Sequence, residues 1–171
     1  MEGSAEVPLE PGPISSEWYD WKWQFRNRIT TVEQLEKVVL LSEKEKRDIS
    51  VCLNNFRMAI TPYYASLMDP KDPKCPIRMQ AIPTINEMKV LPYEMADPLD
   101  EERDSPVKNI VHRYPDRVLF LVTRMCSMYC RHCTRRRTVG EEDFAISDDE
   151  IDTAVDYIAK NEAIRDVLIS G

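Results

Sequence analysis

Long apolar stretches are missing from this sequence of 171 residues. None approaches the ~18 consecutive residues of a membrane-spanning helix, so the sequence predicts no such helix and no membrane partner. The amino-terminal residues also lack a basic segment followed by an apolar one, so we expect no secretory signal peptide. No internal repeat is visible either.

Positive charge is also in short supply. The 23 Lys and Arg residues are outnumbered by 30 Asp and Glu residues, which gives a formal net charge of −7. An acidic chain is a poor electrostatic match for nucleic acid or for an anionic membrane surface. Hydrophobic residues make up 43% and charged residues 31%, which is typical of a globular protein rather than a disordered one.

The five cysteines are odd in number and come without a predicted signal peptide. This combination favours a reducing compartment, which we expect to be the cytoplasm. Cys52 is expected to be a small core residue of a helix, and Cys75 to be a thiol in a turn-rich loop. The other three, Cys126, Cys130 and Cys133, fall within eight residues of one another.

The sequence before residue 110 is typical of helices. We expect a flexible, proline-containing tail over 1–15, and a helical arm with its connector over 16–110. Ser16 is placed to cap a helix that continues to about Ile29 and carries an apolar face. That face would consist of Trp18, Trp21, Phe25 and Ile29. We expect it to dock on the protein itself or on a partner subunit, in preference to an aromatic ligand.

Shorter helices are predicted in the rest of the arm. Each is marked by a capping residue, by proline in the first turn, or by helical spacing of apolar residues. They are expected after Thr31, after Ser42 to about Met58, after Thr61, and around 78–80 and 85–89. Residues 91–110 are polar and contain three prolines, so we expect an irregular connector there.

The pattern becomes that of an α/β protein at about residue 111. Residues 117–123 form a continuous apolar run, typical of a strand covered on both faces. A capping box at Ser147 predicts a helix, and 167–170 is the next predicted strand. The helix should turn Ile151, Ala154, Val155 and Ile158 inward. We therefore expect 111–171 to be the first βαβ unit of an α/β domain. Because the sequence stops where such a strand meets its ligand-binding end, we expect a fragment of a longer protein.

The three clustered cysteines are spaced C-x3-C-x2-C, on the loop after the first predicted strand. Three thiolates from one loop can bind three irons of a 4Fe–4S cluster, which leaves the fourth iron open to a ligand. Arg131 and the arginines at 135–137 are expected to offset the negative charge of the cluster. A zinc site would need four ligands, usually in C-x2-C pairs, and a redox pair at Cys130 and Cys133 would leave Cys126 without a role.

Four strings of residues resemble one enzyme family. The cysteine spacing alone is similar to that of the radical S-adenosylmethionine superfamily. The full string CSMYCRHCTRRR at 126–137, with the strings at 21–28, 57–64 and 112–117, resembles the lysine 2,3-aminomutase family. The resemblance covers nearly the whole chain after residue 15. It implies a partial (β/α) barrel preceded by a helical extension.

The resemblance also implies three cofactors, namely a 4Fe–4S cluster, S-adenosylmethionine and pyridoxal 5′-phosphate. The implied cluster ligands are Cys126, Cys130 and Cys133. The implied contacts to S-adenosylmethionine are His132, near its adenine, and Ser170 and Gly171, which begin a glycine turn near its methionyl part. The implied contacts to pyridoxal phosphate are Arg113, Tyr114 and Arg117. From the residues alone, that last group is typical of a basic surface turn in which Asp116 pairs with an arginine.

The implied reaction moves an amino group from C2 to C3 of an amino acid, with L-lysine as the first choice of substrate and glutamate as the alternative. Arg135 would bind the substrate α-carboxylate. The lysine that binds pyridoxal phosphate would lie beyond Gly171, so we expect the 171 residues alone to be inactive. The expected partners are the amino acid, an electron donor such as flavodoxin or ferredoxin, and further copies of the chain. A zinc or nucleic-acid-binding module is the distant alternative, and the charge and the cysteine spacing both count against it.

Overall fold

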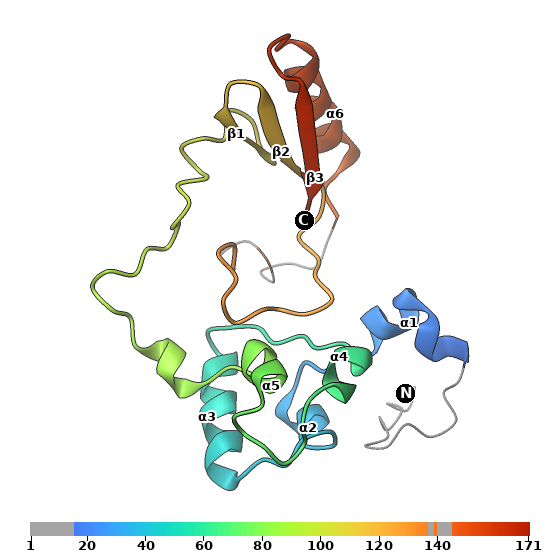
Figure 1. Ribbon diagram of the computed structural model, residues 1–171, viewed down its shortest axis with the longest axis vertical. Helices are drawn as coiled ribbons and strands as arrows, with labels where there is room; N and C mark the ends of the chain where they lie inside the picture. The colour runs from blue at the N-terminus through green and yellow to red at the C-terminus, as the bar shows by residue number, and fades with distance from the viewer. Residues whose placement is uncertain (1–15, 137–138, 140–144) are drawn as a thin grey trace. The chain divides into compact units, whose positions relative to one another are not determined.

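The computed structural model describes residues 16–136, 139 and 145–171 (Figure 1). The predicted tail over 1–15 therefore lies outside the described residues. The chain forms two compact units. A helical unit contains the residues up to Pro92 together with Ser127–Cys133, and a sheet unit contains Tyr93–Cys126 and Thr134–Gly171. Within the described ranges, no helix is long and apolar enough to cross a membrane.

The helical unit is built from short helices whose ends the sequence marks clearly. The Thr31 and Ser42 side chains each accept a hydrogen bond from the backbone three residues on, and Gln34 and Glu45 complete the two predicted capping boxes. Proline in the first turn begins two further helices. The elements are η1 (Ser16–Tyr19), α1 (Trp21–Arg26), α2 (Val32–Leu35), α3 (Glu43–Leu53), α4 (Pro62–Ser66), α5 (Pro76–Ala81) and η2 (Ile85–Met88).

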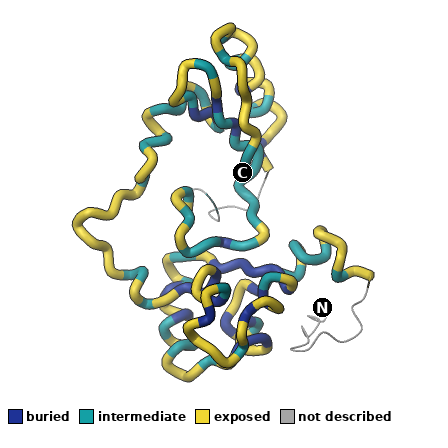
Figure 2. The backbone as a smooth tube through the Cα atoms, viewed as in Figure 1, coloured by how far each residue is buried: buried dark blue, intermediate teal, exposed yellow. Residues whose placement is uncertain are grey.

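A continuous apolar core holds these short helices together. Leu35 and Ile60 are fully buried, and Ile60 exchanges two backbone hydrogen bonds with Ile29, of 2.8 and 3.1 Å. Residues 58–62 form one uninterrupted buried stretch (Figure 2). Because helices of four to eleven residues are marginal by themselves, this packing is what stabilises them.

The predicted single helix from Ser16 to Ile29 is wrong. Asp20 interrupts it, because its side chain accepts a hydrogen bond of 2.9 Å from the Lys22 backbone and caps a separate helix, α1. The expected apolar face is broken with it, and Trp21 is 70% exposed. Trp18 instead pairs with Trp23, with ring centroids 6.0 Å apart.

One other expectation for the arm needs correction, since helix α3 ends at Leu53 rather than near Met58. Cys75 lies in the loop before α5, as predicted, and it is buried there. Its sulfur accepts a hydrogen bond of 3.3 Å from the Asp69 backbone, and this bond holds the pKa of Cys75 below its ordinary value. Cys52 is fully buried, as predicted.

The sheet unit is a three-stranded mixed sheet with one helix against it (Figure 1). Its elements are β1 (Ile110–Tyr114), β2 (Arg117–Leu121), α6 (Asp148–Ala159) and β3 (Asp166–Ser170). The strand order is β1-β2-β3, with β1 antiparallel and β3 parallel to β2. Ile110, Val118, Phe120 and Ala154 pack in a small core between sheet and helix. The predicted strand–helix–strand unit is confirmed as part of this mixed α/β arrangement.

Strand β1 was not predicted, and its presence changes where several candidate residues lie. His112, Arg113 and Tyr114 belong to β1 instead of preceding the first strand, and Arg117 begins β2. Helix α6 starts at the capping box of Ser147 and Glu150, as predicted. However, Val155 is 50% exposed and does not face the core.

Candidate functional site

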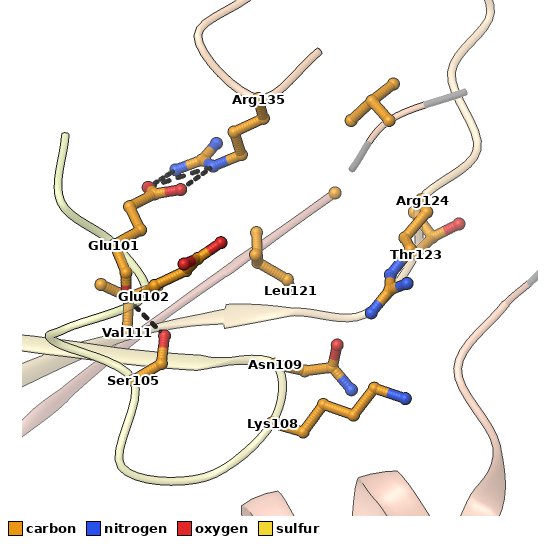
Figure 3. Close-up of a pocket in the computed structure, with 12 residues that line it drawn as sticks. Glu101, Glu102, Ser105, Lys108, Asn109, Val111, Leu121, Thr123, Arg124 and Arg135 are labelled. Atoms are coloured by element: carbon orange, nitrogen blue, oxygen red, sulfur yellow. Dashed lines mark hydrogen bonds and ion pairs between the residues drawn. The ribbon is translucent and has the colours of Figure 1, made fainter. Parts of the chain in front are cut away.

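A pocket of about 290 Å³ opens at the carboxyl ends of β2 and β3 (Figure 3). In sheets with parallel strands this is the edge at which ligands bind, because the loops that follow neighbouring strands meet there. All of the lining residues come from the sheet unit. They are Glu101, Glu102, Ser105, Lys108, Asn109, Val111, Leu121, Thr123, Arg124, Arg135, Val139 and Gly171.

Arg135, the predicted carboxylate-binding residue, lines this pocket and is held by Glu101 (Figure 3). The guanidinium Nε donates to both Glu101 carboxylate oxygens at 3.1 and 3.0 Å, and Nη2 donates to Oε1 at 2.7 Å. This is the forked geometry in which an arginine binds a carboxylate. The Arg135 side chain is therefore able to bind a carboxylate. In this structure the carboxylate that it binds is the side chain of Glu101.

Gly171 also lines the pocket, beside the loop that follows β2. A Cβ atom at Gly171 would lie 2.2 Å from the Thr123 methyl group and 2.8 Å from the Thr123 carbonyl oxygen. Real Cβ atoms essentially never come this close to non-bonded atoms, so glycine permits a close approach that a residue with a side chain could not make without a shift of Thr123. Ser170 belongs to the same edge, and its carbonyl accepts a hydrogen bond of 2.8 Å from the Val122 backbone.

Across the pocket from Arg135 and Glu101, the wall carries Lys108 and Asn109 (Figure 3). Lys108 forms an ion pair with Glu150 of α6. That pair, together with the Ser147 backbone N–H, lowers the pKa of Glu150 to about 2. Asn109 has a left-handed backbone, with φ of 67°. Its side-chain nitrogen is buried without a hydrogen-bond partner.

The cysteine loop is anchored by the residues that separate its cysteines. Tyr129 is buried in the helical unit, and its backbone N–H donates to the Ala59 carbonyl at 3.1 Å. Arg28 and Arg57 each place a guanidinium within 6 Å of its ring centre. The Arg131 backbone N–H donates to the Gln80 carbonyl at 2.8 Å. These contacts fix the course of the segment that bears Cys130.

Arg131 has a structural role besides the charge-offsetting role that the sequence predicts for it, and the latter stays a prediction. Its Nε contacts both Glu87 carboxylate oxygens at 3.2 and 3.1 Å, and its Nη2 contacts one of them at 2.7 Å. Its Nη1 donates to the Arg57 carbonyl at 3.2 Å. Through its contacts with Glu87, Arg131 ties the cysteine loop to η2.

The fit of an iron–sulfur cluster rests on the chemistry of the cysteine side chains. Cys130 and Cys133 lie in the helical unit, where the Cys133 backbone N–H donates to the Cys130 carbonyl at 3.1 Å, and Cys126 lies in the sheet unit. Burial raises the pKa of the Cys130 thiol, and the nearby Cys133 raises it further. Over 16–136, 139 and 145–171, no three His, Cys, Asp or Glu side chains already lie together as a metal site. Thiolates are nevertheless the ligands that such clusters take, and the loop supplies three of them.

The three candidate residues for pyridoxal phosphate lie at the other end of the sheet from the pocket. Arg117 begins β2, six residues before Thr123, which corresponds to ~20 Å along a strand. Arg113 contacts Asp104 at 3.5 Å and the Leu99 carbonyl at 3.2 Å. The structure therefore does not bring this group together with Arg135 and Gly171.

The hairpin end that carries these residues also has the ion pair expected from the sequence alone. Asp116 contacts Arg117 at 2.9 Å and Arg165 at 3.2 Å. The hydrogen bond with Arg117 lowers the pKa of Asp116 and raises that of Arg117. Tyr114 is 58% exposed, with the Arg117 guanidinium 5.6 Å from its ring centre. Two guanidiniums and a phenol fit a phosphate group by their chemistry.

Some expected positions carry less structural support, and some important residues were not foreseen. His132 is exposed on the loop. Arg137 lies outside the described residues.

The sequence did not point to three residues of the site, namely Glu87, Glu101 and Asn109. The contacts of Glu87 and Glu101 reach residues 44 and 34 positions away along the chain, so no local pattern marks them. Only the Asn109 backbone left a local signal, since asparagine is among the few residues that tolerate positive φ.

Comparison with known proteins identifies relatives along nearly the whole chain. No family model matches the sequence. The L-lysine 2,3-aminomutase of Clostridium subterminale is 54% identical over 156 residues, which is 91% of this chain and 38% of that protein. That of Fusobacterium nucleatum is 55% identical over 161 residues, or 94% of this chain and 38% of that protein. The chain is homologous to the L-lysine 2,3-aminomutases.

The predicted resemblance to 2,3-aminomutases is thus confirmed. A glutamate 2,3-aminomutase of Clostridioides difficile is also similar, at 47% identity over 155 residues, or 91% of this chain and 36% of that protein. The chain spans little more than a third of the length of these aminomutases. Because these alignments leave out few of the 171 residues, Arg135 lies in the region shared with lysine and glutamate 2,3-aminomutases.

Proposed function

We propose that this chain is part of a 2,3-aminomutase whose substrate is L-lysine and whose product is β-lysine. The observation that carries the proposal is the identity of 54–55% with L-lysine 2,3-aminomutases over more than 90% of the chain. The glutamate 2,3-aminomutase at 47% is more distant, and glutamate is the second candidate substrate.

Three cofactors are assigned to residues of this chain. Cys126, Cys130 and Cys133 would hold a 4Fe–4S cluster, which fits their thiol chemistry. His132, Ser170 and Gly171 would contact S-adenosylmethionine, and Arg113, Tyr114 and Arg117 would contact pyridoxal phosphate. When bound, the cluster and S-adenosylmethionine supply a radical that abstracts hydrogen, and pyridoxal phosphate supports the migrating amine.

Arg135 would bind the α-carboxylate that lysine and glutamate share. Its guanidinium can bind a carboxylate with two parallel hydrogen bonds, as the bonds from Nε to Oε2 and from Nη2 to Oε1 of Glu101 demonstrate. A fixed carboxylate limits the positions that the neighbouring C2 and C3 atoms can take, and such restriction accelerates reaction. Gly171 would allow a ligand to approach the backbone at the end of β3, because it has no side chain.

The remaining parts of the proposal concern the whole protein. The mixed sheet and α6 would be the beginning of a partial (β/α) barrel, with 16–110 as its helical extension. A low-potential donor such as flavodoxin or ferredoxin would supply the electron, in a cytoplasmic enzyme. Trp21 and Tyr19, which are 70% and 78% exposed, would contribute to contacts between copies of the chain.

The proposal is tested with the full-length protein, reconstituted without oxygen with iron, sulfide, S-adenosylmethionine and pyridoxal phosphate. We expect L-lysine to be converted with a kcat/KM at least ~10-fold above that for L-glutamate, since a well-placed polar contact contributes about this much. Preference for glutamate would favour the second candidate. A colourless protein that binds zinc and converts neither amino acid would contradict the proposal.

A further inference from the structure

Among the described residues, Glu101 of the irregular segment before β1 is an acidic partner of Arg135. We propose that Glu101 is a positioning residue that holds the Arg135 guanidinium ready for the substrate carboxylate. The inference rests on the proposed function, because it takes Arg135 as the carboxylate-binding residue. It adds a residue that neither the sequence motifs nor the comparisons assign.

The contact between the two side chains is close and shielded from water. Three donor–acceptor distances lie between 2.7 and 3.1 Å. The Glu101 side chain is 12% exposed and that of Arg135 is 26% exposed. Both line the pocket at the ends of β2 and β3 (Figure 3). A contact of this kind restricts both side chains far more than an exposed surface ion pair does.

The contact fixes the orientation of the Arg135 guanidinium. An arginine can give a carboxylate two parallel hydrogen bonds from Nε and one Nη atom. Glu101 accepts from these two nitrogens of Arg135. With Glu101 in place, the plane of the guanidinium is set before the substrate arrives.

Fixing a long side chain in advance favours binding. A flexible arginine loses rotamer freedom when a ligand orders it, and the loss weakens the affinity. The negative charge of Glu101 acts in the opposite sense, because it reduces the attraction of Arg135 for another carboxylate. In our proposal the gain from orienting Arg135 in advance exceeds the loss of charge attraction, since the reaction needs the α-carboxylate at one defined position relative to C3.

Glu101→Gln in the full-length protein tests this inference, because glutamine keeps the shape of glutamate and loses its charge. Glu162→Gln is the matched control, since Glu162 is an exposed glutamate of the same unit that does not line the pocket. Equilibrium dialysis measures the Kd for L-lysine and for L-lysine methyl ester, which lacks the carboxylate. Turnover assays give KM and kcat, and iron content and Tm report on structure.

We expect Glu101→Gln to raise the Kd and the KM for L-lysine about ten-fold, the scale of one well-oriented contact. Binding of the methyl ester, iron content and Tm should stay as in wild type, and Glu162→Gln should behave as wild type throughout. Glu101→Asp, which keeps the charge one methylene further away, should give an intermediate KM. It also serves if Glu101→Gln does not fold.

Three results would overturn the inference. Unchanged affinity for L-lysine would show that Glu101 has no role in binding, and tighter affinity would show that it competes with the substrate. Equal weakening of lysine and its ester, with a lower Tm, would show a merely structural role. In these cases wild type still converts lysine. A wild-type protein that neither binds nor converts L-lysine would instead refute the proposed function itself, and the inference with it.

Discussion

The helical unit and the sheet unit differ in how completely they bury their apolar residues. In the helical unit, Leu35 and Ile60 are fully buried and even the charged Arg78 is only 4% exposed. In the sheet unit, Leu168 and Ile169 of β3 are 67% and 65% exposed. One unit has a closed core, and the other has apolar strand surface turned to water.

The two units therefore contribute different things, the helical unit a stable support and the sheet unit the residues of the candidate site. The closed helical unit provides rigid anchoring points, such as the carbonyls of Ala59 and Gln80 that receive the cysteine loop. The sheet unit provides the strand ends that form the pocket with Arg135 and Gly171. Exposed apolar strands are prone to pair with other chains, so we expect the 171 residues alone to aggregate through β3.

The largest expected effect is on the cysteine loop. Alanine at Cys126, Cys130 or Cys133 should abolish the roughly four irons per chain that we expect after anaerobic reconstitution of the full-length protein. Cys52→Ala changes a cysteine of the helical core and should leave the iron content as it is. Iron and sulfide analysis measures the effect. Full iron loading of a Cys130→Ala protein would refute the assignment.

The next effect compares the two cores directly. Leu35→Ala should lower the free energy of unfolding of the helical unit by about 2–5 kcal/mol, because it leaves a cavity among buried side chains. Leu168→Ala should change stability by no more than about 0.5 kcal/mol, since that side chain is exposed. Urea titration followed by tryptophan fluorescence reports on the helical unit, which contains all three tryptophans, and circular dichroism of the same samples includes the sheet unit. Equal destabilisation by the two variants would contradict the comparison.

Arg135→Lys should reduce turnover by the full-length enzyme by about ten-fold, or ~1.4 kcal/mol of transition-state stabilisation. Lysine keeps the charge but cannot form the forked pair of hydrogen bonds. Iron content should not change, and the preference between lysine and glutamate should not change either, because the contact concerns the end that both substrates share. Anaerobic assays with both amino acids measure this. A variant that changes its substrate preference would argue against a carboxylate-binding role.

The smallest effect is a pH dependence of the sheet unit. The pKa of Glu150 is lowered from 4.5 to about 2 by Lys108 and the Ser147 backbone. A lowered pKa means that the folded state favours the charged carboxylate, so this contribution to stability is present above pH 4.5 and is lost as the pH falls toward 2. Glu150→Gln or Lys108→Met should reduce the loss of stability over that range. Urea unfolding followed by circular dichroism at several pH values measures it, and unchanged curves would refute the role of the pair.

Elements with strong local signals could be predicted from the sequence. The capping boxes at Ser42 and Ser147 place the starts of α3 and α6, and the apolar runs place β2 and β3. Strand β1 was missed because only Ile110 and Val111 are buried in it, and its polar remainder follows a stretch of polar, proline-containing chain. The break at Asp20 was missed because a competing cap there outweighs helical spacing.

The candidate site was predicted in part, for a similar reason. Arg135 could be named from a string of neighbouring residues, and the structure places it in the pocket. Its partner Glu101 could not, since the ion pair depends on tertiary structure that joins residues 34 positions apart. The same holds for Arg131, whose pairing with Glu87 anchors the cysteine loop and could not be foreseen from the local sequence.

The central claim is that this chain belongs to an enzyme that moves the C2 amino group of lysine to C3. The most direct measurement is to incubate the full-length, reconstituted protein anaerobically with L-lysine labelled with ¹⁵N at the α-amino group, and to follow the label by NMR. The account predicts β-lysine with the label attached to C3. Unchanged lysine, or a product in which the label has been released, would contradict it.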